Sequence, residues 1–179
     1  GSTDDSRQLV ESAGGQWFVN TNWQGFGKQR QLAQSYATGD WVLALDADEE
    51  ITPQLKQSIL EVIAQPPANT VYGIKRIDCI FGHEIDNSYW ALKAHWRLYP
   101  KTFQYNDNLV HESVELNGAV TKTLKGTMLH HTADTPQFWL DKRLQYSKAW
   151  AVDRHQRGKN VSIFSVILHA NWAFIKQYL

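Results

Sequence analysis

The sequence predicts an α/β fold in which a mixed, mostly parallel sheet is flanked by helices. Through the first 70 residues, short apolar runs alternate with segments of helical spacing, which is typical of this class. The run 41–45 is apolar without interruption and leads directly into 46–50, which holds four carboxylates. Such a run indicates a central strand covered on both faces. We expect its acidic end at the ligand-binding edge, because ligands of open α/β sheets bind beyond the carboxyl ends of the strands.

The first half of the chain reads as alternating helices and strands. Glycines end the first two helices, at Gly14 and Gly39, and Thr52 followed by Pro53 marks the start of the third. The third helix keeps its apolar spacing as far as the proline pair at 66–67. The expected elements are a helix at 6–13, a strand at 17–19, a helix at 28–37, a strand at 41–45 and a helix from 53.

The second half has more antiparallel character. Asn117 and Gly118 form a strong two-residue hairpin signal between two strand candidates. The stretch 82–94 has no clean period, and we expect it to be a loop facing an acceptor. The expected strands are 71–81, 95–99, 110–116 and 119–124, followed by a helix from 136 to about 157 that Gly158 ends.

Composition excludes some classes of function. Lys and Arg together number 18, as do Asp and Glu, so the chain has no electrostatic footprint for nucleic acid. Its 179 residues fit one domain with a real core rather than two full domains. A signal-peptide pattern and an apolar run of about 20 residues are both absent from the sequence. With a single cysteine, this favours a reducing, cytoplasmic location.

The acidic segment itself indicates a cation site. Asp46 and Asp48 are two residues apart, so in extended chain their carboxylates point to the same face and can converge on one hard divalent ion. That geometry suits a metal bound to a diphosphate. The alternative is a solvated acidic turn that opens a helix, where carboxylates also favour the helix dipole.

Several segments carry a resemblance to a known family. The order and spacing of 1–6 (GSTDDS), 27–30 (GKQR), 39–41 (GDW) and 46–50 (DADEE) resemble glycosyltransferase family two. Segments 97–99, 109–112, 129–132 and 146–147 resemble the branch that adds glucose to the inner core of bacterial lipopolysaccharide. The resemblance covers nearly the whole chain. It implies the GT-A fold, a Rossmann-like fold of nucleotide-diphospho-sugar transferases.

The resemblance also implies how the chain is organised. Residues 1–134 correspond to a partial GT-A catalytic domain, with a nucleotide-sugar half at 1–70 and an acceptor half at 71–134, and 135–179 form a C-terminal helical extension. In the family, the GSTDD segment follows a strand that ends in a uracil-contacting aspartate. We therefore expect a strand–helix–strand unit of the family to be missing before residue 1.

The implied reaction moves a sugar, glucose in the resembling branch, from a UDP-sugar to a glycolipid or lipopolysaccharide core acceptor, with inversion. The family implies Mg²⁺ or Mn²⁺ bound directly by Asp48, while Asp46 reaches the ribose or the metal through water. A cation that bridges the phosphates stabilises the charge of the leaving nucleoside diphosphate.

The resemblance assigns donor roles to two further residues. Arg30 approaches the nucleotide, since a guanidinium matches phosphate oxygens, although it also fits a surface charge on an amphipathic helix. Asp4 is placed to help the nucleotide loop, although a plain turn or cap role is equally compatible.

Four more residues complete the expected site. Glu112 is expected to be the general base that takes the proton of the attacking hydroxyl, with an exposed strand residue as the alternative. Of the histidine pair 130–131, we favour His130 as a further metal ligand, with a structural role left open. Arg97 and Trp96 lie where the family binds acceptor, although core packing explains the tryptophan equally well.

The C-terminal stretch 161–179 is apolar and flanked by cationic residues. It resembles an interfacial helix, which predicts peripheral association with the inner face of the cytoplasmic membrane. A helix packed on the domain or on a second subunit is the alternative. The competing function is a non-catalytic module that binds a sugar nucleotide or glycan, or an incomplete transferase fragment.

Overall fold

The computed structural model describes residues 2–85, 93–108, 112–156, 158 and 162–178. The chain divides into two compact units, residues 1–132 and 133–179. This division lies close to the expected boundary at 134, while the assignment of nucleotide-sugar and acceptor halves stays a prediction. The elements of the first unit are α1 (Ser6–Ser12), α2 (Phe26–Ser35), β1 (Trp41–Leu43), β2 (Glu49–Ile51), α3 (Pro53–Ile63), β3 (Thr70–Ile80), β4 (His83–Ile85), β5 (Ala94–Pro100) and β6 (Val120–Ala133).

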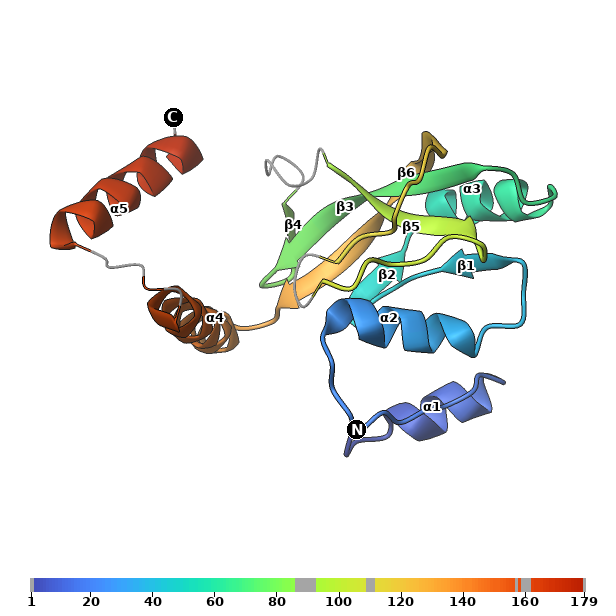
Figure 1. The fold of residues 1–179 in the computed structure, drawn as a ribbon, viewed down its shortest axis with the longest axis horizontal. Coiled ribbons are helices and arrows are strands. Elements are labelled where there is room, and N and C mark those ends of the chain that lie inside the picture. The colour runs from blue at the N-terminus through green and yellow to red at the C-terminus, as the bar shows by residue number, and fades with distance from the viewer. Residues whose placement is uncertain (1, 86–92, 109–111, 157, 159–161, 179) are drawn as a thin grey trace. The chain divides into compact units, whose positions relative to one another are not determined.

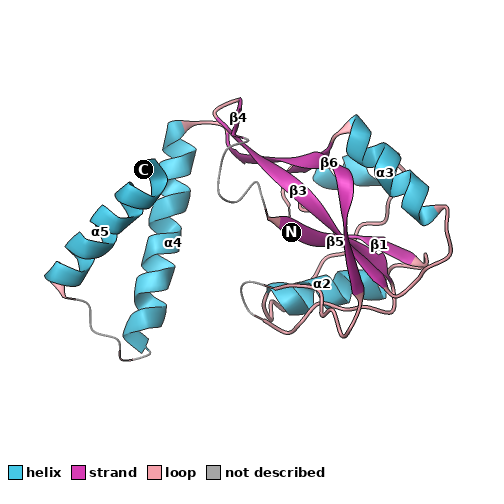
Figure 2. Cartoon of the chain, turned by 90° about the horizontal axis from the view of Figure 1, so that it is seen from above, coloured by secondary structure: helices cyan, strands magenta, loops and turns pink. Residues whose placement is uncertain are grey.

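The first unit is a sheet with α2 and α3 on opposite faces (Figures 1 and 2). Under α3, Leu55 and Ile59 pack on one face of the sheet with Ile74, Leu98 and Met128. The other face carries a second apolar cluster, whose buried members are Val71, Tyr99, Phe103, Tyr105 and Val114. Burial on both faces confirms the α/β layering that the sequence predicted.

More of the sheet is antiparallel than expected. The strand order is β1-β5-β3-β6-β2, with β4 paired to β3 off this path. The ladders β1–β5, β3–β5, β3–β4 and β2–β6 are all antiparallel. The acidic strand β1 thus pairs with β5, an antiparallel strand from the second half of the chain.

The acidic strand differs in position from the expectation. It is short, because only Trp41–Leu43 pair with β5, and it ends the order of the described strands instead of lying at the centre. Its side chains nevertheless alternate between the two apolar clusters, with Trp41 and Leu43 on one and Val42 and Ala44 on the other. Coverage of both faces, rather than a central place, is the reason that the run is apolar.

Two predicted local structures also differ. The expected strand at 17–19 does not form. Phe18 instead stacks on Tyr36, the residue directly after α2, with ring centroids 3.8 Å apart. The turn at Asn117 and Gly118 is present, with both residues in the left-handed region. Its arms do not form a hairpin, because Val120 at the start of β6 donates its N–H to Asn69 instead.

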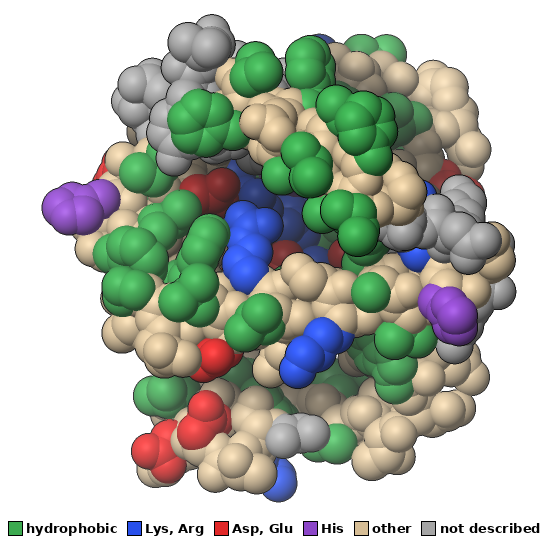
Figure 3. Space-filling view, turned by 90° about the vertical axis from the view of Figure 1, so that its left-hand side faces the viewer, with side chains coloured by type: hydrophobic (Ala, Val, Ile, Leu, Met, Phe, Trp, Pro, Cys, Tyr) green, Lys and Arg blue, Asp and Glu red, His purple; other side chains and the backbone are tan. Residues whose placement is uncertain are grey.

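The second unit consists of α4 (Pro136–Gln156) and α5 (Ile163–Tyr178). Both helices expose large apolar side chains, including Leu144, Trp150, Phe164 and Trp172. Figure 3 shows hydrophobic side chains, in green, on the surface of the face that it views. Within the part of the chain that the structure describes, none of the helices has the length and apolarity needed to cross a bilayer.

The start of α3 is tied to β6 at one point. Thr52 caps the helix as predicted, since its hydroxyl oxygen accepts the N–H of Leu55 at 3.3 Å, and the same hydroxyl donates to Thr127 O at 2.7 Å. Next to this contact, Gly126 has a φ of +85°, and a Cβ there would lie 2.5 Å from Leu55 N. Gly126 therefore lets β6 pass directly over the first turn of α3.

Gly126→Ala is expected to destabilise the first unit more than Gly118→Ala does. Both glycines have left-handed φ angles, which cost an alanine about 1–2 kcal/mol, but only Gly126 has backbone in the space of the added Cβ. The overlap adds about 1–3 kcal/mol. Urea unfolding followed by circular dichroism measures both losses, and equal losses would contradict a close crossing of β6 over α3.

Candidate functional site

The acidic segment forms a tight turn between two strands. After β1, Glu49 donates its N–H to the carbonyl of Asp46 at 3.0 Å, and β2 begins at Glu49. The side chains of Asp46 and Asp48 are each 41% exposed, whereas that of Glu49 is completely buried. Two of these three carboxylates are therefore partly open to solvent, and the third is buried.

Asp46 is held by two arginines. Arg30 from α2 pairs with Asp46 Oδ1, and Arg97 from β5 donates to Asp46 Oδ2 at 3.0 Å. Burial alone would raise the pKa of Asp46, but the charges and hydrogen bonds of the two guanidinium groups outweigh it and lower the pKa. Asp46 is therefore ionised at neutral pH, and both of its oxygens are engaged.

Glu49 holds both Arg97 and Asp46 in place. Its carboxylate accepts Arg97 Nη2 at 2.5 Å and the N–H of Asp46 at 2.9 Å. Sequence reasoning missed this role. The available signal was Arg97 itself, because an arginine in the apolar segment 94–100 needs a buried acid.

The structure changes the role expected for Arg97. Its side chain is only 8% exposed, and it forms ion pairs with Asp46 and Glu49. A buried guanidinium that already holds two carboxylates is not available to an acceptor sugar. Arg97 is instead a residue that positions Asp46.

Glu112 lies beside Arg30. Its Oε1 is 3.7 Å from Arg30 Nε, and its side chain is 18% exposed. The Arg30 guanidinium also lies 5.6 Å from the centre of the Tyr105 ring, over its face. The structure thus brings the expected base, the expected nucleotide-binding arginine and Asp46 into one connected group.

His130 lies beside Asp48. The β2–β6 ladder pairs Glu49 with His130, which brings His130 Nε2 to 3.4 Å from Asp48 Oδ2. The neighbouring His131 points elsewhere and contacts the exposed Glu50 at 3.1 Å. Of the histidine pair, His130 is therefore the one placed for a shared ligand with Asp48. Among the described residues, no group of three or more His, Cys, Asp or Glu side chains is gathered to hold a metal.

Asp4 and Trp96 lie apart from this group in their contacts. Asp4 Oδ1 accepts the N–H of Ser6 at 3.1 Å, the local turn contact that was left open as the alternative. Trp96 is half-buried and packs against the second apolar cluster, with its ring over Gly73. The nucleotide role of Asp4 and the acceptor role of Trp96 stay predictions.

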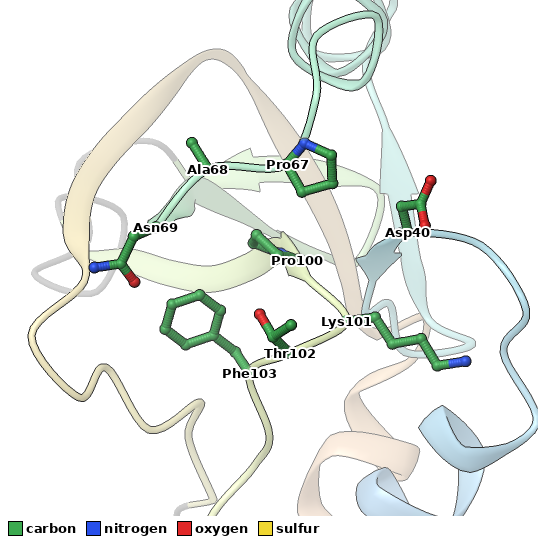
Figure 4. Close-up of a pocket in the computed structure, with 8 residues that line it drawn as sticks. All are labelled: Asp40, Pro67, Ala68, Asn69, Pro100, Lys101, Thr102 and Phe103. Carbon is green, nitrogen blue, oxygen red and sulfur yellow. The ribbon is translucent and has the colours of Figure 1, made fainter.

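A separate pocket of about 530 Å³ lies at the other end of the β1–β5 ladder (Figure 4). Asp40, just before β1, and Pro100, at the end of β5, line it together with Pro67–Asn69 and Lys101–Phe103. The acidic turn follows the opposite end of β1. This pocket is therefore separate from the group around Asp46.

One further titratable residue, His95, lies on β5 two residues before Arg97. His95 of β5 has a half-buried side chain, and its buried Nε2 has no hydrogen-bond partner among the described residues. Burial first, and then the positive charges of Arg76, Arg97 and Lys93, lower its pKa to about 4, against a smaller opposing effect of Asp78. His95 is therefore neutral at physiological pH.

Comparison with known proteins identifies the family. The family model described as Glycosyl transferase family 2 matches residues 1–117 of the 179. The chain belongs to this family. Family membership confirms the α/β, GT-A fold predicted from the sequence.

Individual relatives agree with this assignment. An uncharacterized glycosyltransferase of Rickettsia prowazekii is 29% identical over 188 residues, which cover 99% of this chain and 64% of the relative. The lipopolysaccharide core biosynthesis glycosyltransferase LpsC of Rhizobium meliloti is 25% identical, and the match covers 99% of this chain and 68% of LpsC. A TPR repeat-containing protein of Synechococcus elongatus is 36% identical over 69 residues, 38% of this chain and 17% of its own. The chain thus spans 64% of the length of the Rickettsia prowazekii and Rickettsia typhi relatives.

Arg97→Met is expected to destabilise the first unit by about 3–5 kcal/mol, because it leaves the buried carboxylate of Glu49 without its cation. Combining it with Glu49→Gln should recover part of the loss, since the unpaired charge is then gone. Denaturant unfolding of both single variants and the double variant measures the coupling. Additive losses would show that the two side chains do not depend on each other.

Stability is expected to fall as the pH is lowered from about 7 to about 4.5, and His95→Leu should reduce the fall. The pKa of His95 is 6.5 when unfolded and about 4 when folded, so between these values the unfolded chain binds a proton that the folded chain does not. The stabilisation is complete above the unfolded pKa and is lost toward the folded one, with a slope of at most about 1.4 kcal/mol per pH unit. His83→Leu, at an exposed residue, is the control and should keep the wild-type slope.

Proposed function

We propose that this chain carries the donor-binding edge and the catalytic base of a glycosyltransferase that uses a UDP-sugar, with glucose as the sugar. The carrying observation is that Asp48 and His130 lie 3.4 Å apart. Two residues before Asp48, Asp46 is bound by Arg30 and Arg97. We propose that a cation site and a diphosphate site adjoin after β1. This activity is proposed for a whole protein. The chain spans 64% of the length of the Rickettsia prowazekii and Rickettsia typhi relatives.

The residues present fit a divalent cation in part. Asp48 offers a half-exposed carboxylate and His130 an imidazole 3.4 Å away, a donor set that suits Mn²⁺ or Mg²⁺. Asp46 is less available, because Arg30 and Arg97 occupy its two oxygens. We propose that donor phosphate oxygens and water complete the coordination. When bound, the cation neutralises charge that develops on the departing diphosphate.

Arg30 and Glu112 supply the remaining chemistry. Arg30 presents a guanidinium on the same side as Asp46, where it can bind a phosphate oxygen of the donor. Glu112, 3.7 Å from Arg30, takes the proton of the acceptor hydroxyl as that oxygen attacks the anomeric carbon. Attack opposite to the departing diphosphate gives inversion, and only one carboxylate base is needed.

We propose a glycolipid or lipopolysaccharide core as acceptor. LpsC, one of the relatives, is named for lipopolysaccharide core biosynthesis. The apolar side chains that α4 and α5 expose support peripheral attachment to the cytoplasmic face of a membrane, where such an acceptor is presented. Trp96 remains the proposed acceptor-binding residue, and Arg97 is no longer proposed for that role.

A non-catalytic sugar-nucleotide or glycan-binding module is the second candidate. It is favoured by one observation, which is that Arg30 and Arg97 already occupy both carboxylate oxygens of Asp46. Both candidates bind a nucleotide sugar, but only the transferase breaks the bond between sugar and diphosphate. Release of UDP from UDP-glucose by the chain would reject the module.

The UDP affinity of the chain is expected to be higher with Mn²⁺ than with EDTA, and Asp48→Ala should remove the difference. Asp40→Ala removes a carboxylate at the other end of β1 and should leave the difference intact. Isothermal titration calorimetry measures all three proteins. Equal wild-type affinity in Mn²⁺ and EDTA would overturn the metal assignment.

In a protein that releases UDP, Glu112→Gln should lower the rate of UDP release about 10²–10⁴-fold, while the UDP affinity is retained.

A further inference from the structure

His130 is held on both sides of its ring. Nδ1 lies 2.8 Å from Asp78 Oδ1, while Nε2 lies 3.4 Å from Asp48 Oδ2. Asp78 belongs to β3 and His130 to β6, which are neighbours in the sheet (Figure 1). The side chains of Asp78 and His130 are only 17% and 16% exposed. The contact to Asp78 is thus a semi-buried one between neighbouring strands, and it lies on the side of the ring away from Asp48.

The proton on Nδ1 follows from the contacts of Asp78. Arg76 Nε lies 3.2 Å from the same oxygen, Asp78 Oδ1, so this carboxylate is paired with a guanidinium as well as with the imidazole. An ionised carboxylate only accepts hydrogen bonds, so Nδ1 must carry a proton. Thr132 fits the same assignment, because its hydroxyl can accept from Nδ1 at 3.0 Å and donate to His130 O at 3.3 Å.

A neutral His130 with its proton on Nδ1 has its lone pair on Nε2, the nitrogen that faces Asp48. We propose that Asp78 is a positioning residue that fixes His130 in this tautomer and orientation, so that Nε2 and Asp48 bind one divalent cation together. The inference rests on the proposed function, in which Asp48 and His130 are the cation ligands. It adds Asp78, which lies 30 residues after Asp48 in the sequence.

A different role for the same contacts is a structural ion bridge. In that case His130 is doubly protonated and links the carboxylates of Asp48 and Asp78 without binding a metal. The two roles differ in what removal of Asp78 does. An orienting carboxylate next to a ligating histidine contributes about 10–100-fold to metal affinity, whereas a bridge that excludes a metal would increase access to Asp48 when it is broken.

The first experiment determines the tautomer of His130 in the metal-free chain. Two-bond proton–nitrogen NMR spectra of ¹⁵N-histidine-labelled protein at about pH 8, where ordinary imidazoles are neutral, report which ring nitrogen is protonated, and His130→Gln assigns the signals. We expect a proton on Nδ1 in the wild type and in Asp78→Asn, whose amide oxygen still accepts it. Asp78→Ala should show a shift toward the Nε2-protonated tautomer. A wild-type ring protonated on Nε2, or an unchanged ring in Asp78→Ala, would overturn the inference.

The second experiment measures Mn²⁺ binding without any reaction. Electron paramagnetic resonance of free Mn²⁺ gives the affinity of the wild type, Asp78→Ala, Asp78→Asn and the control Asp141→Ala, which removes an exposed carboxylate on α4. Asp78→Ala should weaken binding about 10–100-fold, Asp78→Asn less, and Asp141→Ala not measurably. Thermal unfolding identifies any variant that fails to fold, and Asp78→Asn then carries the comparison.

The outcomes separate the inference from the proposed function. If the wild type binds Mn²⁺, Asp48→Ala abolishes binding and Asp78→Ala leaves it unchanged, then Asp78 has no positioning role while the cation site stands. If the wild type binds no Mn²⁺ even with UDP present, the cation site of the proposed function fails, and the ligand role of His130 fails with it. Stronger Mn²⁺ binding by Asp78→Ala supports the structural bridge and overturns the inference.

Discussion

The buried ion pair between Glu49 and Arg97 is the constraint on which the rest of the site depends. Burying two charges is costly unless each is paired and its remaining hydrogen-bonding groups are satisfied. Here the carboxylate of Glu49 also accepts the N–H of Asp46, and the guanidinium of Arg97 also reaches Asp46 Oδ2. The pair therefore fixes both the backbone and the side chain of Asp46. The turn between β1 and β2 has little freedom to place Asp46 elsewhere.

The charges around this pair bear on what the site can bind. Two guanidinium groups, of Arg30 and Arg97, face the three carboxylates of Asp46, Glu49 and Glu112. The arginines are thus already balanced by the protein, and a diphosphate arriving without a counterion would add negative charge to a group that has no positive excess. Asp48 adds a further carboxylate. A divalent cation beside His130 relieves this imbalance, which is the electrostatic reason to expect a metal together with the donor.

The sequence predicted those parts of the fold and site that local patterns determine. Continuous apolar character located the acidic strand, Thr52 and Pro53 located the start of α3, and the spacing of Asp46 and Asp48 placed two carboxylates at the strand end. It did not predict the place of β1 in the sheet, because coverage of both faces produces the same apolar run at either place. The missing hairpin at 117–118 has a similar cause, since turn residues fix the turn but not the partners of its arms.

Residues that act across strands escaped prediction for another reason. Glu49 and Asp78 are recognisable only when β5 and β6 are known to lie beside them, and no local period carries that information. The role of Arg97 was changed by the same long-range pairing. Sequence patterns can identify a buried arginine as needing an acid, but several carboxylates near 46–50 were equally good candidates. Their assignment needed the strand order.

Three acidic residues within positions 46–49 have three different partners. Asp46 pairs with the arginines of α2 and β5. Asp48 lies in the turn, where its side chain contacts His130. Glu49 begins β2, opposite His130 in the ladder, and its side chain is buried. Because side chains alternate along a strand, a shift of the β2–β6 register by one residue would exchange His130 for a neighbour that faces the other side. The contact of β6 with the first turn of α3, through Thr52 and Gly126, opposes that shift. A packing contact far from the chemistry thus determines which imidazole meets Asp48.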